Sequence, residues 1–300
     1  MPGETGRGLI LLAGATSTAE VSPRAASLRS LRVHGRDLVE PTAAAADPPG
    51  MAGAVLAPWP NRVASARWTY DGAEQRLAVT EPEFGHANHG LLADRDFTVR
   101  HATPDTVTLA AAIDGEPGYP FRLDVAVTYR LAPDGLDAAT AITNRGDRPA
   151  PAATGAHPYL RAGDAPAAAL RLDADRARLP GRTHLPGPPF AVAGTGYDLR
   201  EPVPFARLPR HLTYERAQGP SRHRLTAPDG TSVELRADAN HRWFQLYVDP
   251  ALATDDGPRA AIAVEPMTAP PDALNTGEGL HWLAPGETWT VEWGLRLQPV

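Results

Sequence analysis

The sequence of 300 residues predicts an all-β protein, an antiparallel β-sandwich, and three observations lead to this fold class. Prolines (32) and glycines (27) are spread almost evenly, which leaves few windows for a helix of three turns. The segments between them alternate apolar and polar residues, or are rich in β-branched residues, as strands are. No strand–helix rhythm of about 30 residues runs through the chain, and this argues against a parallel α/β fold.

The predicted strands follow one another with turn residues between them. Arg67–Tyr70 and Gln75–Thr80 form a hairpin, because Asp71-Gly72 between them tolerates the positive φ of a tight turn. Pro180–Pro209 is rich in Pro, Gly and Arg, and predicts long loops over one sheet face, a rim for a site. No repeat or linker divides the chain, so one domain is expected over residues 1–300. The other predicted strands are Thr106–Ile113, Leu123–Leu131, Leu136–Asn144, Ser232–Asp238, Trp243–Asp249, Ala260–Glu265 and Trp289–Leu297.

Composition excludes several function classes. The net charge of −6 and the scattered basic residues give no support to binding of nucleic acid or an anionic membrane. Without cysteine there is no thiolate catalysis, no cysteine-ligated zinc and no disulfide. Without lysine there is no Schiff base, no pyridoxal phosphate and no P-loop. No targeting signal and no apolar run of about 18 residues is present, so we expect a cytoplasmic protein.

The stretch around Glu265 predicts a general base. Ala260–Val264 reads as a buried strand that ends in this carboxylate and is then stopped by Pro266. A glutamate at the exit of a buried strand is held by its backbone and partly desolvated, which raises its pKa towards neutrality. The alternative is a glutamate at a strand end that faces water.

A loop with two prolines, Pro58–Val63, presents Asn61 and Arg62 just before a strand. The guanidinium of Arg62 offers a fixed fork of donors to a substrate hydroxyl or carboxylate, or alternatively clamps loop carbonyls. Further on, Glu81 and Glu83 lie together, but no other feature makes them a glycosidase pair.

Two histidine-containing stretches offer further polar groups. His86 and His89 suggest a metal, but in a glycine-containing loop positions i and i+3 share no face, and further zinc ligands are missing. We therefore expect no metal, and interpret His89, beside Gly90, as part of a small-molecule site. Pro158 fixes the backbone of His157 as extended, and an imidazole can donate a proton near neutrality. The alternative for His157 is a structural histidine.

Together and in this order, these stretches resemble the aldose 1-epimerase (galactose mutarotase) family, in its bacterial branch with the Pro-Trp-Pro-Asn-Arg loop. The resemblance covers the chain from about Leu28 to Leu297. The stretches that carry it are Pro58–Val63, His89–Leu91, Gly118–Phe121, Asn144, Gly155–Leu160, Val264–Thr268 and Leu283–Glu287.

The resemblance implies a galactose-mutarotase-like β-sandwich and a cofactor-free exchange between the α and β anomers of a free monosaccharide. It implies that Glu265 takes the proton of the anomeric hydroxyl and His157 protonates the ring oxygen. Arg62, His89 and Asn61 are then expected to hold the sugar. Trp243 is a further candidate, since flat aromatic faces stack on sugar rings.

The chain departs from the family pattern at one sugar-binding position, where His211 stands in place of an aspartate; Asp198 lies nearby in the sequence and is a substitute acceptor. Two alternative functions stay open, and the sequence is compatible with either a monomer or a homodimer. One is a mutarotase for phosphorylated hexoses, which needs converging arginines such as Arg200, Arg207 and Arg210. The other is a carbohydrate-binding or sensor domain without catalysis, although a pure binder needs no acid and base together.

Overall fold

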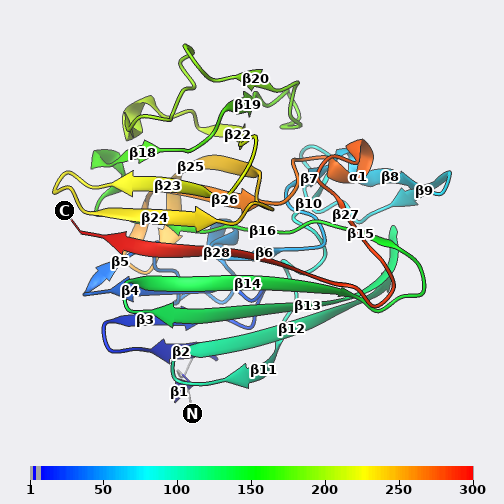
Figure 1. Ribbon diagram of the computed structural model, residues 1–300, viewed down its shortest axis with the longest axis horizontal. Helices are drawn as coiled ribbons and strands as arrows, with labels where there is room; N and C mark the ends of the chain where they lie inside the picture. Colours follow the sequence, from blue (N-terminus) through cyan, green and yellow to red (C-terminus); the bar gives the residue numbers. More distant parts are fainter. Residues whose placement is uncertain (1–2, 5–7, 300) are drawn as a thin grey trace.

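The computed structural model describes residues 3–4 and 8–299 and consists almost entirely of antiparallel sheet (Figure 1). The predicted all-β sandwich is confirmed. Among the described residues, the one α-helix, α1 (Ala273–Thr276), has four residues, and four short 3-10 turns cover residues 49–51, 64–66, 165–167 and 205–207.

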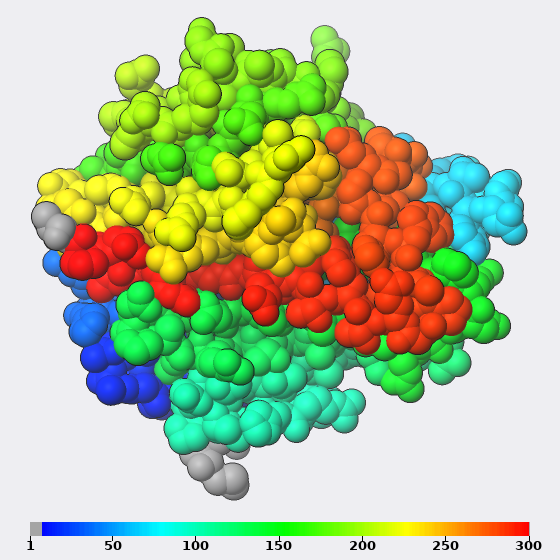
Figure 2. All heavy atoms as spheres, in the orientation of Figure 1, coloured from blue at the N-terminus to red at the C-terminus, as the bar shows by residue number. Residues whose placement is uncertain are grey.

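A nine-stranded sheet forms one layer, with its C-terminal strand inserted in the middle. Figure 2 shows this as a red band between green and yellow ones. In spatial order its strands are β11 (Thr98–Ala102), β12 (Thr106–Glu116), β13 (Tyr119–Ala132), β14 (Gly135–Asn144), β28 (Thr288–Gln298), β24 (Ser232–Ala237), β23 (Ser221–Thr226), β18 (Ala169–Arg171) and β21 (Val203–Pro204).

An eight-stranded sheet carries the candidate site. Its strands, in spatial order, are β20 (Phe190–Ala191), β19 (Arg176–Arg178), β22 (His211–Glu215), β25 (Trp243–Thr254), β26 (Gly257–Met267), β16 (Gly155–Ala156) and β6 (Val55–Leu56), and β17 (Tyr159–Leu160) also pairs with β26. The rings of His223 on β23 and Phe244 on β25 lie 4.0 Å apart, so the two large sheets pack together there.

A five-stranded N-terminal sheet packs against the large sheet through the contacts of β2, β3 and β4 with β12, β13 and β14. Its strands are β1 (Gly3–Glu4), β2 (Ile10–Ala13), β3 (Ser17–Val21), β4 (Leu28–Val33) and β5 (Arg36–Asp37). Three two-stranded pairs complete the fold: β7 (Arg62–Val63) with β10 (Ala87–Asn88), β8 (Arg67–Tyr70) with β9 (Ala73–Arg76), and β15 (Ala150–Ala152) with β27 (His281–Leu283).

All strands predicted after the hairpin are present, and β8 and β9 turn at Asp71-Gly72 as predicted. The bounds of the second hairpin strand are wrong: Gln75–Thr80 was predicted, whereas β9 starts directly after the turn and ends at Arg76, where its pairing with the four-residue β8 ends. The N-terminal sheet was not predicted. Its strands are short, and fully buried Arg29 occupies a core position of β4, which disrupts the apolar pattern. The Pro180–Pro209 segment is mostly loop as expected, but it also contributes β20 and β21.

Candidate active site

The register of the eight-stranded sheet places four polar side chains in one row across one of its faces. Arg178 lies opposite Thr213, Thr213 opposite Gln245, and Gln245 opposite Glu265. Side chains two residues apart on a strand point to the same face, so His211 and Tyr247 share this surface. The row gives the candidate site a rigid floor, with Glu265 at one end.

Glu265 is 2% exposed, and burial raises the pKa of its carboxyl to about 8, against the opposing influence of the Arg62 guanidinium. The sequence placed it at the end of its strand, and this detail is wrong: β26 continues through Pro266 to Met267. The amide of Val264 donates towards Pro158, so the nitrogen of Pro266, two residues on, faces the same side. On that side Pro266 lies between the two short strands that pair with β26, β17 and β16, so β26 needs no backbone donor at this position.

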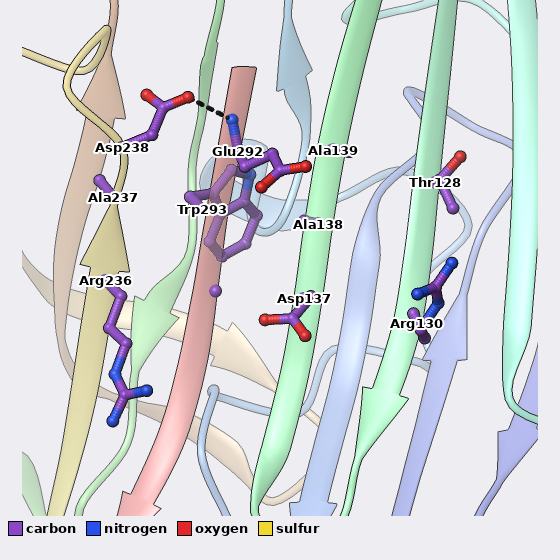
Figure 3. Close-up of a pocket in the computed structure, with 11 residues that line it drawn as sticks. Thr128, Arg130, Asp137, Ala138, Ala139, Arg236, Ala237, Asp238, Glu292 and Trp293 are labelled. Carbon is purple, nitrogen blue, oxygen red and sulfur yellow. Dashed lines mark hydrogen bonds between the residues drawn. The ribbon is translucent and has the colours of Figure 1, made fainter. Parts of the chain in front are cut away.

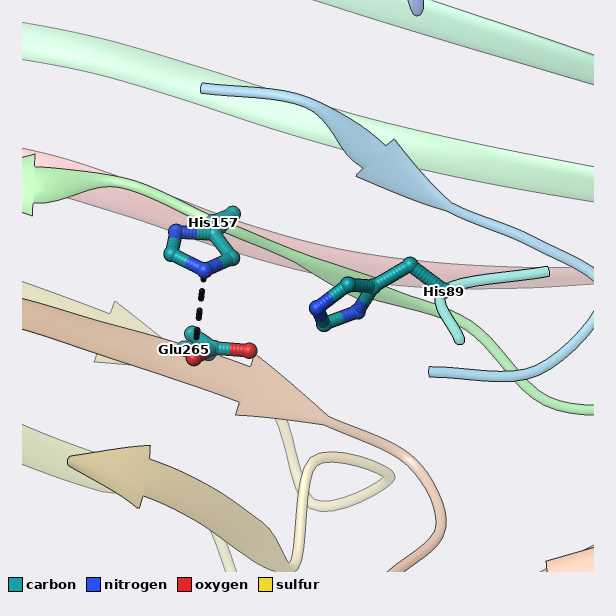
Figure 4. Close-up of side chains that lie close together, drawn as sticks. All are labelled: His89, His157 and Glu265. Atoms are coloured by element: carbon teal, nitrogen blue, oxygen red, sulfur yellow. Dashed lines mark ion pairs between the residues drawn. The ribbon is translucent and has the colours of Figure 1, made fainter. Parts of the chain in front are cut away.

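His157 faces Glu265 across a short gap (Figure 4). Its Nε2 lies 3.4 Å from Oε1 of Glu265, and both side chains are almost completely buried. Burial lowers the pKa of His157 to about 4. Because the lower pKa belongs to the imidazole and the higher one to the carboxyl, the pair holds a single proton between about pH 4 and about pH 8.

His89 completes the cluster, and its proton position is set by the backbone. The amide of Asn61 donates to Nδ1 of His89 at 3.2 Å, so the proton of the neutral imidazole lies on Nε2. Burial lowers the pKa of His89 well below its usual range, and the ring is therefore neutral. Its Nε2–H is a donor, and its ring stands edge-on to that of His157 with centroids 5.6 Å apart.

Asn61 and a carboxylate fix the position of Arg62. Asn61 has a φ of 57° and accepts the Arg62 amide on its side-chain oxygen, while its side-chain nitrogen donates to Gln245 at 3.4 Å. The guanidinium of Arg62 donates to both carboxylate oxygens of Glu81, from Nη2 to Oε1 at 2.6 Å and from Nε to Oε2 at 2.7 Å. A bidentate pair of this kind holds the plane of the guanidinium.

His211 lies on the site surface as predicted, and is accompanied by two residues that the sequence did not single out. Burial lowers its pKa to about 4, with further contributions from Arg62 and His184. Its Nδ1 lies 3.3 Å from Nδ1 of His184, and its ring stands edge-on to that of Tyr247. Tyr247 is partly exposed, and burial and the carboxylates of Asp249 and Glu265 raise its pKa.

Two residues that the sequence predicted as sugar contacts, Asp198 and Trp243, are not available to a ligand beside this cluster. Asp198 is bound by Arg200 within its own loop. The carbonyl of the neighbouring Tyr197 accepts a hydrogen bond from the hydroxyl of Tyr214. Because the side chain of Tyr214 is on the opposite face of β22 from Thr213, this contact holds the Asp198 loop on the far side of the sheet. Trp243 does share the strand face of Gln245, but it is 2% exposed. The backbone at Gly279 packs so closely over its ring that an added Cβ would lie 2.7 Å from it.

The cluster also has the composition of a metal site. One ligand atom from each of His89, His157 and Glu265 lies within 4.8 Å of the others. A ligating histidine normally donates its second ring N–H to an acceptor, but Nδ1 of His89 already accepts a backbone N–H. Nδ1 of His157 is buried and, within the described part of the chain, without a hydrogen-bond partner. These hydrogen bonds fit a proton donor at His89 better than a metal ligand.

A hollow of about 430 Å³ lies on the nine-stranded sheet, away from this row (Figure 3). Arg130, Asp137, Arg236 and Glu292 stand around it, from four neighbouring strands. It contains no histidine, and so no side chain that exchanges a proton near neutrality. The buried cluster is the better candidate for catalysis.

Sequence reasoning missed Gln245, Tyr247 and Glu81. The first two follow Trp243 at alternate positions of one strand, and only the strand register shows that Gln245 lies opposite Glu265 and Tyr247 opposite Ala263, two residues away. Glu81 was considered as half of a glycosidase pair rather than as the partner of Arg62, 19 positions earlier.

Comparison with known proteins finds relatives over most of the chain. The model of the aldose 1-epimerase family matches residues 8–296. The chain is 32% identical to the uncharacterised protein YihR of Escherichia coli K12, over 93% of this chain and 89% of that protein. It is 29% identical to human galactose mutarotase, over 53% of this chain and 47% of that enzyme.

Solved structures show the same fold. A galactose mutarotase and aldose epimerase homologue from C. elegans superimposes with a TM-score of 0.84 at 20% identity, covering 98% of this chain and 99% of that one. A galactose 1-epimerase from Lactobacillus acidophilus gives 0.82 at 16% identity, over 99% and 97%. The expected galactose-mutarotase-like fold is confirmed. No helix in residues 3–4 and 8–299 is long and apolar enough to span a bilayer.

Proposed function

Because the chain belongs to the aldose 1-epimerase family, we propose that it interconverts the α and β anomers of a free monosaccharide by acid–base opening and closure of the sugar ring. The observation that carries the proposal is the buried pair of Glu265 and His157, 3.4 Å apart. Anomer exchange requires one group that accepts a proton and one that donates a proton at the same pH.

The reaction needs a proton removed from the anomeric hydroxyl and a proton added to the ring oxygen. Glu265 takes the first as a carboxylate, and His157 gives the second as an imidazolium. The bond between C1 and the ring oxygen breaks, and C1 becomes an aldehyde carbon. After rotation about the C1–C2 bond, the two groups exchange roles and the ring closes on the other face.

The single proton of the pair explains how this chemistry starts in a buried site. In the resting protein the proton stays on the carboxyl, because burial disfavours both charges. Its transfer to Nε2 of His157 creates the reactive carboxylate and imidazolium without any change in net charge. Arg62, which counteracts the raised pKa of Glu265, favours the ionised form.

The remaining polar groups are suited to holding sugar hydroxyls. Nε2–H of His89 is a fixed donor beside His157, and in the proposed reaction it supports the ring oxygen. Arg62 keeps its orientation through Glu81 while it faces the cluster. No group in this scheme requires a cofactor.

Polarimetry of freshly dissolved glucose, galactose, arabinose and xylose tests the proposal. Wild type should accelerate the approach to anomeric equilibrium for at least one sugar. Glu265→Gln and His157→Asn should stay folded and lose about 10²-fold or more in rate, as expected when a positioned acid or base is removed. Wild-type rates in Glu265→Gln would contradict the mechanism. Acceleration only with hexose phosphates would favour the phosphorylated substrates, and sugar binding without any acceleration would favour a sensor domain.

A further inference from the structure

A small loop, residues 181–185, contacts the site through His184, whose ring lies against that of His211. It follows β19 and is closed by hydrogen bonds of its own, from Gly181 to Leu185 and from His184 back to Gly181. Thr183 is exposed, whereas His184 is partly buried and has a φ of 61°. This left-handed backbone is uncommon for residues other than glycine, although histidine adopts it more readily than most.

Two residues of another loop hold it. Nδ1 of His86 accepts the amide of Ser65 at 3.0 Å, so its proton lies on Nε2, and Nε2 donates to the carbonyl of Thr183 at 3.0 Å. The ring of Phe84 lies 4.8 Å from that of His184. The two contacts join segments about 100 positions apart in the sequence.

Within this loop, His184 contacts His211. Their rings stand at 66° with centroids 4.8 Å apart, and the two Nδ1 atoms are 3.3 Å apart. At this distance the two Nδ1 atoms can share one proton, so that one ring donates and the other accepts. The contact with His184 therefore holds the orientation of the His211 ring, and the role that Nδ1 takes in it decides whether Nε2 of His211 donates or accepts. Within the described part of the chain, no hydrogen bond engages this Nε2.

We propose that residues 181–185 are a strap latched over the sugar site by Phe84 and His86, and that His184 is a positioning residue that presents His211 to a substrate hydroxyl. The inference rests on the proposed function for its substrate class. In this proposal two imidazole rings, His211 on β22 and His184 on the loop, take the place of the expected aspartate.

Steady-state kinetics on the best of the four sugars test the role of His184. His184→Ala should raise KM about three- to tenfold, the value of one neutral hydrogen bond, with kcat within about twofold. His184→Asn, whose amide can occupy the place of Nδ1, should restore most of the affinity. His101→Ala, an exposed histidine on β11, is the matched control and should not change KM. A wild-type KM in His184→Ala would overturn the role of His184 while leaving the proposed activity intact.

Limited proteolysis tests the strap without using activity. The chain has no lysine, so trypsin cuts only after arginine, and exposed Arg182 lies within the strap. A saturating sugar should slow the cut after Arg182 several-fold, and Phe84→Ala should accelerate it several-fold. The cut after exposed Arg145 serves as the internal control and should not respond.

The two arms separate the two ideas. If wild type accelerates no sugar, the proposed function fails. The rate of cutting after Arg182 in Phe84→Ala still shows whether Phe84 holds residues 181–185 in place. Equal rates of cutting after Arg182 in wild type and Phe84→Ala would overturn the strap.

Discussion

Replacement of Glu265 by glutamine should make the protein more stable relative to wild type as the pH rises. The folded-state pKa of this carboxyl is about 8, whereas its ordinary value is 4.5. Between these two values the unfolded chain loses the proton and the folded protein keeps it, so wild-type stability falls with rising pH. Glutamine resembles the protonated carboxyl and does not ionise, and the variant is free of this loss.

The magnitude follows from the separation of the two pKa values. One pKa unit corresponds to about 1.4 kcal/mol, so the interval from 4.5 to about 8 corresponds to on the order of 5 kcal/mol. The two proteins should be similarly stable at pH 4.5, and the variant should gain most of this difference by pH 8. Contributions from all other groups are common to both proteins and cancel in the comparison.

Urea unfolding, followed by the fluorescence of the six tryptophans, measures the difference at a series of pH values. Circular dichroism of both proteins at each pH establishes that they start from the same fold. A difference in unfolding free energy that does not change between pH 4.5 and pH 8 would refute the argument that burial raises this pKa. The same variant is expected to lose activity, so function and stability should move in opposite directions.

Three further outcomes are expected. Gly90→Ala should lower the unfolding free energy by about 3 kcal/mol, because φ is 79° and an added Cβ would lie 2.1 Å from the carbonyl of Ala57; Gly85→Ala, with φ of 72° and open space, should cost only about 1 kcal/mol in the same urea titration. Glu40→Gln should gain on the order of 3 kcal/mol relative to wild type between pH 4.5 and pH 7, because burial raises the Glu40 pKa to about 7; an unchanging difference would contradict this. For wild type, kcat/KM should be flat between about pH 4 and about pH 8 and fall on both sides, as the acid–base pair gains a second proton or loses its only one; a profile centred near pH 4 would contradict the assignment.

Local features of the fold could be predicted from the sequence, and non-local ones could not. The hairpin at Asp71-Gly72 follows from the φ that its turn requires, a property of two adjacent residues. The N-terminal sheet depends on β4, where the guanidinium of Arg29 is buried against Thr42, and no pattern of alternation reveals such a position.

The same division applies to the site. Glu265 and His157 were found because each is marked by a neighbouring proline, but they are 108 positions apart and only the sheet brings them within 3.4 Å. Gln245 is next to Glu265 through strand register alone. His184 carries no local signal, because its role depends on the ring of Phe84 in a separate loop.

The hydrogen bonds of the histidines determine which ring nitrogen of each is a donor. His86 and His89 both accept a backbone amide on Nδ1, and both therefore carry their proton on Nε2. Nε2–H of His86 donates to the carbonyl of Thr183 in the loop of residues 181–185, whereas Nε2–H of His89 lies in the site. A loop of irregular backbone is thus required to aim the amides of Ser65 and Asn61, both of which have positive φ. These positive-φ residues lie beside the site and fix which ring nitrogen of each histidine is a donor. In the proposed reaction, the buried pair of Glu265 and His157 needs fixed donors around it, because they stabilise charges that are absent from the resting protein.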